Sequence, residues 1–169
     1  MSASLPAPEP GDAPANEVAL RVRFDETDMM GIVHHSRYWS WFEEARFRFM
    51  EGVLAVSVAD LREQALYMPV VDSRCRYLRS VTWSDALRVR VHMEAAVAAR
   101  FQFYYDVRLA GPHGQCVALG TTRHVFTDAG MGLKLTVPEF YRAKWATALA
   151  RFPDAFIDRP PRGLRRGAA

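Results

Sequence analysis

The stretch FDETDMMGIVHHSRYW, residues 24–39, decides the fold because it joins two segments of different periodicity. Before it, residues 18–24 alternate apolar and polar side chains, which predicts a strand. After it, apolar side chains recur at helical spacing from Ser36 to Glu51, and Gly52 is placed to end the helix. Further apolar residues lie off that stripe, so this helix is apolar over most of its girth and is expected to be buried.

Long strand-like runs dominate the chain that follows this helix. They cover residues 66–79, 85–98, 100–110 and 114–128, and GPHG at 111–114 predicts a hairpin turn. Residues 137–152 predict a closing helix with Pro138 in its first turn. One buried helix and five strands pack most simply as an α+β fold in which an antiparallel sheet curls around the helix. Because such a sheet leaves open edges, a dimer is expected.

The length of 169 residues suits one folded domain. We expect residues 1–16, rich in proline and alanine, to be a disordered leader, residues 17–150 to be the domain, and residues 151–169 to be a basic tail. No apolar run is long enough to cross a bilayer, so no stable membrane insertion is expected, and the first residues do not resemble a secretory signal. The two cysteines, Cys75 and Cys116, do not make a disulfide framework, which favours a reducing, cytoplasmic setting.

The net charge of +3 is unevenly distributed along the chain. Residues 159–169 carry four arginines and no acid, whereas the body is close to neutral. A nucleic-acid-binding protein would carry a clustered basic face, so nucleic acid is not an expected partner. The tail is interpreted as a solvated segment in preference to a contact for phosphates, a membrane or a protein.

The turn before the helix carries the chemistry that the sequence offers. Gly31 permits a tight turn, and free backbone N–H groups near His35 and Ser36 lie at the positive end of the helix dipole. Such groups can stabilise a carbonyl oxygen as it gains negative charge, and Asp28 upstream can act as a nucleophile or as a base for water. Together these parts suit acyl transfer, although an aspartate here can also simply cap the turn.

A metal site is the alternative for the histidines of this stretch. His34 and His35 could join Asp25 or Glu26, but adjacent histidines do not share one face of an element, and no second ligand pair at helical spacing follows. We therefore expect no metal, and we interpret Asp25, Glu26 and His34 as loop or wall residues. Glu43 and Glu44 on the helix are expected to pair with neighbouring arginines. No serine-nucleophile, Walker or dinucleotide motif is present.

The segment VRFDETDMMGIVHHSRYWSWFEEAR, residues 22–46, resembles the signature of hot-dog-fold acyl-CoA thioesterases. It is similar to the 4-hydroxybenzoyl-CoA thioesterase type, including the Tol–Pal-associated branch. The residues in register are Thr27, Asp28, Gly31, Val33, His35, Tyr38, Phe42, Glu43, Ala45 and Arg46. Residues 68–91 and 120–128 resemble later strands of the same family, so the resemblance covers about residues 18–137.

This resemblance implies an acyl-CoA thioesterase of hot-dog fold that needs no cofactor. It implies that Asp28 is the catalytic carboxylate, that the N–H near His35 polarises the thioester carbonyl, and that the His35 side chain assists. It also makes Tyr38, Arg76 and Arg79 candidates for substrate contact. Family active sites form between two subunits, so a homodimer or homotetramer is implied.

The chain departs from the family signature at three positions. Phe24 replaces a tyrosine, His34 an aromatic residue and Arg37 an asparagine, so the acyl pocket or the helix start is expected to differ. An acyl-carrier-protein thioesterase and a non-catalytic acyl-CoA-binding module are the alternative functions. The acyl group itself is not predicted, because aromatic side chains near the helix and strands can line a pocket or form the core; they are Trp39, Trp41, Phe101, Phe103 and Tyr104.

Overall fold

The computed structural model describes residues 14–111, 114–161 and 163–164. In chain order the elements are β1 (Glu17–Arg21), the 3-10 helix η1 (Phe24–Glu26), α1 (Arg37–Gly52), α2 (Val58–Glu63), β2 (Val70–Tyr77), β3 (Ala86–Glu94), β4 (Arg100–Leu109), β5 (Cys116–Thr127), β6 (Leu133–Lys134), α3 (Glu139–Arg151), the 3-10 helix η2 (Pro153–Ala155) and β7 (Phe156–Ile157).

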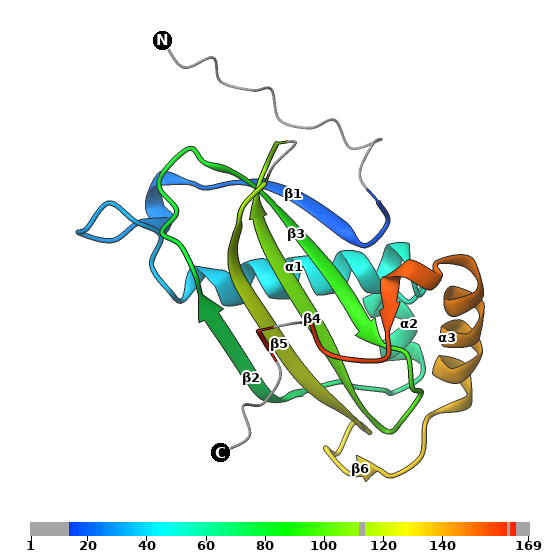
Figure 1. The fold of residues 1–169 in the computed structure, drawn as a ribbon. Helices are drawn as coiled ribbons and strands as arrows, with labels where there is room; N and C mark the ends of the chain where they lie inside the picture. The colour runs from blue at the N-terminus through cyan, green and yellow to red at the C-terminus, as the bar shows by residue number, and fades with distance from the viewer. Residues whose placement is uncertain (1–13, 112–113, 162, 165–169) are drawn as a thin grey trace, which may run out of the picture.

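One sheet organises the described part of the chain. Its main path runs β1-β3-β4-β5-β2, all neighbours antiparallel, while β6 pairs with β5 and the short β7 runs parallel to β3. Helix α1 crosses behind this sheet along one face, and α3 packs at the side near β7 (Figure 1). The sheet therefore leaves α1 on its inner face and a second face turned outward.

Helix α1 is buried because apolar side chains occupy most of its circumference. Its buried residues are Tyr38, Trp41, Phe42, Ala45, Arg46, Phe49 and Met50. Phe42 stacks on Tyr105 of β4 with 4.4 Å between ring centroids, and Phe49 meets Phe103 edge-on at 5.6 Å. A curved antiparallel sheet around a central helix is the hot-dog fold, so the predicted α+β class is confirmed.

Five small elements were not among those predicted from sequence: the 3-10 helices η1 and η2, helix α2, and strands β6 and β7. Helix α2 lies in the segment after α1, and β6 and β7 are two-residue strands that exist through their pairing with β5 and β3. Strand β7 falls within the segment expected to be the basic tail, where Phe156 is buried. Residues 1–13 of the expected leader, 112–113 of the expected hairpin turn, and 162 and 165–169 of the tail lie outside the described residues.

None of the helices in the described residues is long and apolar enough to cross a membrane. Both cysteines are free thiols, and burial raises the pKa of Cys75 and of Cys116 to about 11. Neither thiol is therefore a nucleophile at neutral pH.

Candidate active site

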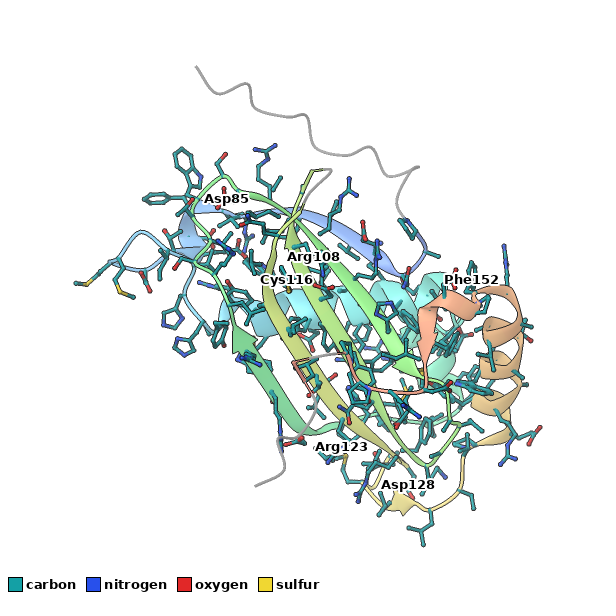
Figure 2. The ribbon with its side chains drawn as sticks, viewed as in Figure 1. Asp85, Arg108, Cys116, Arg123, Asp128 and Phe152 are labelled. Atoms are coloured by element: carbon teal, nitrogen blue, oxygen red, sulfur yellow. The ribbon has the colours of Figure 1, made fainter. Side chains whose placement is uncertain are left out.

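The turn that precedes α1 lies against the loop between β2 and β3. Ile32 forms a bridge with Thr82, and the Val33 N–H donates to the Val81 carbonyl at 2.8 Å. Asp85 marks the β3 end of that loop in Figure 2, where it lies at the same end of the molecule as the turn. The turn and this loop, about fifty residues apart in sequence, therefore lie side by side.

The turn itself is a tight hairpin closed at Thr27 and Val33, which form an antiparallel bridge. The Asp28 N–H donates to the Ile32 carbonyl, and the Gly31 N–H donates to the Asp28 carbonyl, both at 2.9 Å. Gly31 has φ +74°, a left-handed conformation that glycine adopts without steric cost. Gly31 therefore lies in the site as the residue that allows the turn, and it is not one of the residues that line the cavity.

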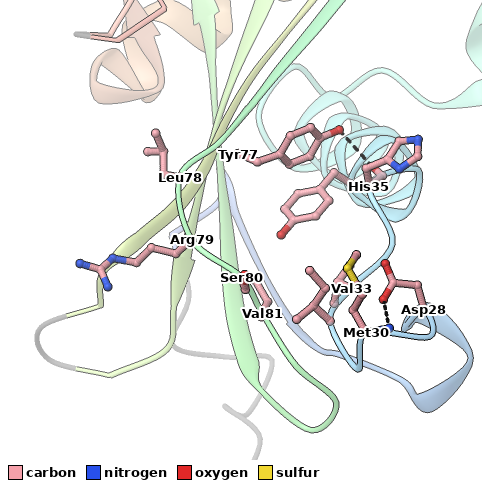
Figure 3. A pocket seen from close by; sticks show the side chains of 11 residues that line it. Asp28, Met30, Val33, His35, Tyr77, Leu78, Arg79, Ser80 and Val81 are labelled. Carbon is pink, nitrogen blue, oxygen red and sulfur yellow. Dashed lines mark hydrogen bonds between the residues drawn. The ribbon is translucent and has the colours of Figure 1, made fainter.

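Asp28 presents its carboxylate to a cavity of about 360 Å³ (Figure 3). One carboxylate oxygen, Oδ1, accepts a hydrogen bond from the Met30 N–H at 2.8 Å, which fixes the side chain. The other oxygen accepts no hydrogen bond from any described residue. Asp28 is thus oriented by the turn and keeps one oxygen available to a substrate or to water.

The start of α1 lies on the wall of the same cavity. The His34 N–H donates to the Glu26 carbonyl at 2.9 Å, and the Arg37 N–H donates to the His34 carbonyl at 3.0 Å. Between them, the His35 N–H has no acceptor within the described part of the chain, and the Ser36 side chain does not cap the helix. An unpaired N–H at a helix N-terminus can bind an anion or a carbonyl oxygen.

The imidazole of His35 is exposed and packs on the ring of His34, with 4.2 Å between ring centroids. The His34 Nδ1 in turn lies 2.8 Å from the Ser36 Oγ. His35 lines the cavity and His34 does not. The assisting role expected of His35, and the loop or wall role expected of His34, stay predictions.

Two tyrosines form the aromatic side of the cavity. Tyr38 is only 3% exposed, and burial, with a smaller contribution from Cys75, raises its pKa to about 12, so the hydroxyl stays protonated at neutral pH. Tyr77 at the end of β2 meets Tyr38 edge-on at 5.0 Å and donates its hydroxyl to the His35 carbonyl at 3.2 Å. The sequence predicted Tyr38 but not Tyr77, although Tyr77 lies in the R-Y-L-R segment of the family resemblance.

The two candidate arginines lie in different places. Arg79 is among the residues that line the cavity, but its guanidinium points away from Asp28 (Figure 3). Arg76 does not line it, and its Nη1 donates to the Gly163 carbonyl at 3.3 Å, on the opposite face of β2 from Tyr77. Only Arg79 is therefore brought to the cavity with Asp28, His35 and Tyr38.

Glu26 differs from its predicted role as a loop or wall residue. Its side chain is buried, and its Oε1 accepts a hydrogen bond from the Trp41 Nε1 at 2.9 Å. Nothing in the local sequence distinguishes Glu26 from exposed Asp25, so only the structure reveals the difference. Across residues 14–111, 114–161 and 163–164, no group of three or more histidine, cysteine, aspartate or glutamate side chains could hold a metal ion.

The arrangement brings Asp28 and His35, whose backbone N–H has no acceptor among the described residues, to one cavity. An electrophilic carbonyl bound there could place its oxygen on the His35 N–H and its carbon toward the free oxygen of Asp28. Such a placement would suit acyl transfer, in which a donor stabilises the developing oxyanion while a carboxylate attacks or activates water.

Comparison with known proteins points the same way. The profile of the thioesterase-like superfamily matches residues 22–157. A 1,4-dihydroxy-2-naphthoyl-CoA hydrolase of Synechococcus is 31% identical over 132 residues, covering 75% of this chain and 87% of the relative. An acyl-CoA thioesterase of Haemophilus influenzae is 29% identical over 84 residues, covering 50% and 62%. The crystal structure of the DHNA-CoA thioesterase of Staphylococcus aureus matches with a TM-score of 0.70 at 24% identity, covering 82% of this chain and 91% of that one.

Proposed function

Because the chain belongs to the thioesterase-like superfamily and is a thioester hydrolase, we propose that it cleaves acyl- or aryl-CoA thioesters to a free acid and coenzyme A. The single observation that carries this proposal is that Asp28 and His35, whose N–H has no acceptor among the described residues, line the same cavity. Relatives that act on 1,4-dihydroxy-2-naphthoyl-CoA favour an aryl group among the candidate acyl groups. The aromatic wall formed by Tyr38 and Tyr77 is consistent with such a substrate.

In the proposed reaction, the thioester carbonyl oxygen accepts a hydrogen bond from the His35 N–H. The free oxygen of Asp28 then attacks the carbonyl carbon, or it removes a proton from a water that attacks. Either route expels the thiolate of coenzyme A, and the helix N-terminus stabilises the negative charge on the carbonyl oxygen. The attacking water gives the free acid directly, whereas attack by Asp28 leaves the acyl group on its carboxylate as an anhydride, which a water molecule then hydrolyses to the free acid and Asp28. The His35 imidazole has an assisting role, and neither metal nor cofactor takes part.

Substrate contact beyond the reacting atoms is assigned to Tyr38 and the two arginines. The Tyr38 hydroxyl is a protonated donor at neutral pH and suits an oxygen of the acyl group. Arg79 points outward from the cavity, so we assign it to a phosphate of coenzyme A outside the acyl pocket. Arg76 can serve the same phosphates only if it leaves the Gly163 carbonyl.

We further propose that the chain belongs to the 4-hydroxybenzoyl-CoA thioesterase type, with its Tol–Pal-associated branch, and that it acts in the cytoplasm as a homodimer or homotetramer. The register of Asp28, Gly31 and His35 with that signature supports the branch. Among the described residues, β2 ends the main path of the sheet, which supports assembly because an edge strand presents backbone groups to a second copy.

Replacing Asp28 by asparagine tests the function directly. We expect D28N to lose about 10²- to 10⁴-fold in turnover, the range over which a positioned acid–base group contributes, while its unfolding transition stays close to wild type. Coenzyme A release is measured over a series of short-acyl, aryl and long-acyl CoA thioesters. The matched control is D25N, because Asp25 is a neighbouring exposed acid that does not line the cavity.

Two outcomes would contradict the proposal. Turnover by D28N within twofold of wild type would exclude Asp28 as the catalytic carboxylate. Wild-type turnover confined to carrier-protein thioesters, with none of the CoA series hydrolysed, would assign the chain to acyl-carrier-protein release instead.

A further inference from the structure

Glu26 is a buried carboxylate in a turn whose other acids are exposed or half-buried. The residue is 4% exposed, whereas the side chain of neighbouring Asp25 is 63% exposed. Burying a carboxylate is costly unless hydrogen bonds compensate for the lost water. The hydrogen bonds that the Glu26 carboxylate accepts therefore have to compensate for its burial.

Both side-chain oxygens of Glu26 are occupied by donors from different segments. Oε1 accepts from the indole Nε1 of Trp41 at 2.9 Å, in the first turns of α1. Oε2 accepts from the backbone N–H of Arg23 at 2.8 Å, just after β1. The Arg23 guanidinium lies 3.8 Å from Oε1, but its side chain is 67% exposed, so it contributes little to fixing the carboxylate.

The backbone carbonyl of Glu26 completes the set of contacts by accepting the His34 N–H at 2.9 Å. Glu26 thus joins the end of β1, the chain that leaves the turn, and the body of α1. Asp28 lies two residues after Glu26 on the incoming arm of the turn, and His35 lies one residue after His34 on the outgoing arm. The contacts of one residue therefore fix both arms at their base.

We propose that Glu26 is a positioning residue that holds the Asp28 carboxylate and the His35 N–H in register across the cavity. This proposal rests on the proposed function, in which those two groups act on one carbonyl. Glu26 does not line the cavity, so it acts only through its neighbours. A displacement of about 1 Å between reacting groups costs about 10²-fold in rate, so such a residue is visible in turnover.

The geometry requires a carboxylate, because two donors meet two acceptor oxygens. In E26Q one of those oxygens becomes an NH₂ group, which faces either the Arg23 N–H or the Trp41 Nε1 as a second donor. In E26A both donors lose their partner, and the indole N–H is left buried without an acceptor. W41F removes only the donor from α1 and keeps the contact with Arg23.

We expect a graded loss of kcat, with KM within about threefold of wild type, because the change affects alignment and not substrate contact. E26Q and E26A should lose about 10- to 100-fold in kcat, and W41F less. The conservative variant E26D, which keeps both oxygens on a shorter side chain, should recover part of the loss. D25N, which removes the neighbouring exposed carboxylate, should keep wild-type kcat.

The assays are run well below the unfolding midpoint of each variant, measured by circular dichroism, so that lost activity does not reflect unfolded protein. Wild-type kcat in folded E26Q would overturn the proposal, and so would a kcat loss in every Glu26 variant that matches its unfolded fraction. If E26A does not fold, the comparison of E26Q, E26D and W41F decides the outcome. D28N is assayed in parallel: an active D28N refutes Asp28 as the catalytic carboxylate, on which this proposal rests, whereas an inactive D28N beside a fully active E26Q refutes only the role of Glu26.

Discussion

At the scale of single residues, one histidine is buried in the sheet, whereas His34 and His35 near the turn are exposed. His124 on β5 is fully buried, and its Nδ1–H donates to the Met68 carbonyl at 2.9 Å. Its Nε2 lies 2.9 Å from the Thr122 hydroxyl, which is 2.7 Å from the Tyr105 hydroxyl. All three side chains have a partner when Tyr105 donates to Thr122 and Thr122 donates to neutral His124. A protonated imidazole would oppose that order, because its Nε2 would also be a donor.

Burial lowers the pKa of His124 from its ordinary 6.5 to about 4. Between pH 6.5 and about pH 4, His124 therefore binds a proton in the unfolded chain but not in the folded chain. The stabilisation is fully present above pH 6.5 and is lost as the pH falls toward 4. We expect about 2–3 kcal/mol of the free energy of unfolding to disappear over this window through His124 alone.

The measurement is urea unfolding of wild type and H124Q at pH 7.5 and pH 4.5. H124Q should be less stable at pH 7.5 but should lose less stability on acidification than wild type. The half-buried His92 has a pKa also lowered, mainly by burial, and it titrates in both proteins, so it cancels in the comparison. Parallel losses in the two proteins would show that His124 is not the group that titrates.

Residues near the turn differ in how far the sequence could place them. The D-x-x-G spacing and the start of a helical pattern predict where Asp28, Gly31 and His35 lie, because local backbone geometry determines their positions. Glu26 is determined by a contact with Trp41, fifteen residues further along the chain, and the sequence carries no local mark of that contact. Tyr77 reaches the site through the pairing of β2 with the rest of the sheet, which is likewise a tertiary event.

At the scale of elements, the Phe42 ring of α1 fits against β5 because β5 carries a glycine at that point. A Cβ atom added at Gly120 would overlap the Phe42 ring. Phe42 also stacks on Tyr105, the residue of β4 that pairs with Gly120, so the ring has little room to move. The glycine thus serves the packing of two elements and not a turn.

We expect G120A to cost about 1–3 kcal/mol in the free energy of unfolding, the range seen when a packed core receives an extra methyl group. The smaller side chain in F42L should relieve part of this cost, so G120A/F42L should be more stable than the sum of the two single changes predicts. G130A in an exposed turn, where the added Cβ meets only an ordinary contact with Asp128, is the control. Chemical denaturation of all four variants measures the coupling, and strict additivity would contradict it.

Long elements were predicted well because their periodicity extends over many residues. The helix expected from Ser36 to Glu51 forms from Arg37 to Gly52, and each of the four long strand-like runs contains a strand. Strands β6 and β7 have two residues each, too few to show a period, and they exist only because β5 and β3 offer backbone partners. Short elements of this kind depend on the finished sheet.

At the scale of the whole molecule, the main path of the sheet ends at β1 on one side and at β2 on the other. Strand β2 has eight residues against five in β1, and apolar side chains at or near its ends are exposed: Val70 by 48%, Val71 by 53% and Tyr77 by 45%. An exposed apolar edge strand is a site for pairing with another chain. Pairing of β2 with a second copy would lie beside Tyr77, and hence beside the cavity.

We therefore expect wild type to sediment at twice or four times the mass of one chain and V71K to shift toward one chain. The lysine places a charge on the edge where two copies would meet, while Val71 is already exposed in the single chain, so folding should be unaffected. L135K, at an apolar residue 81% exposed between β6 and α3, is the matched control and should keep the wild-type mass. If the site is completed by the partner, kcat of V71K should fall as the fraction of monomer rises, and it should recover at higher protein concentration. A monomeric wild type, or a V71K protein of unchanged mass, would exclude assembly through this edge.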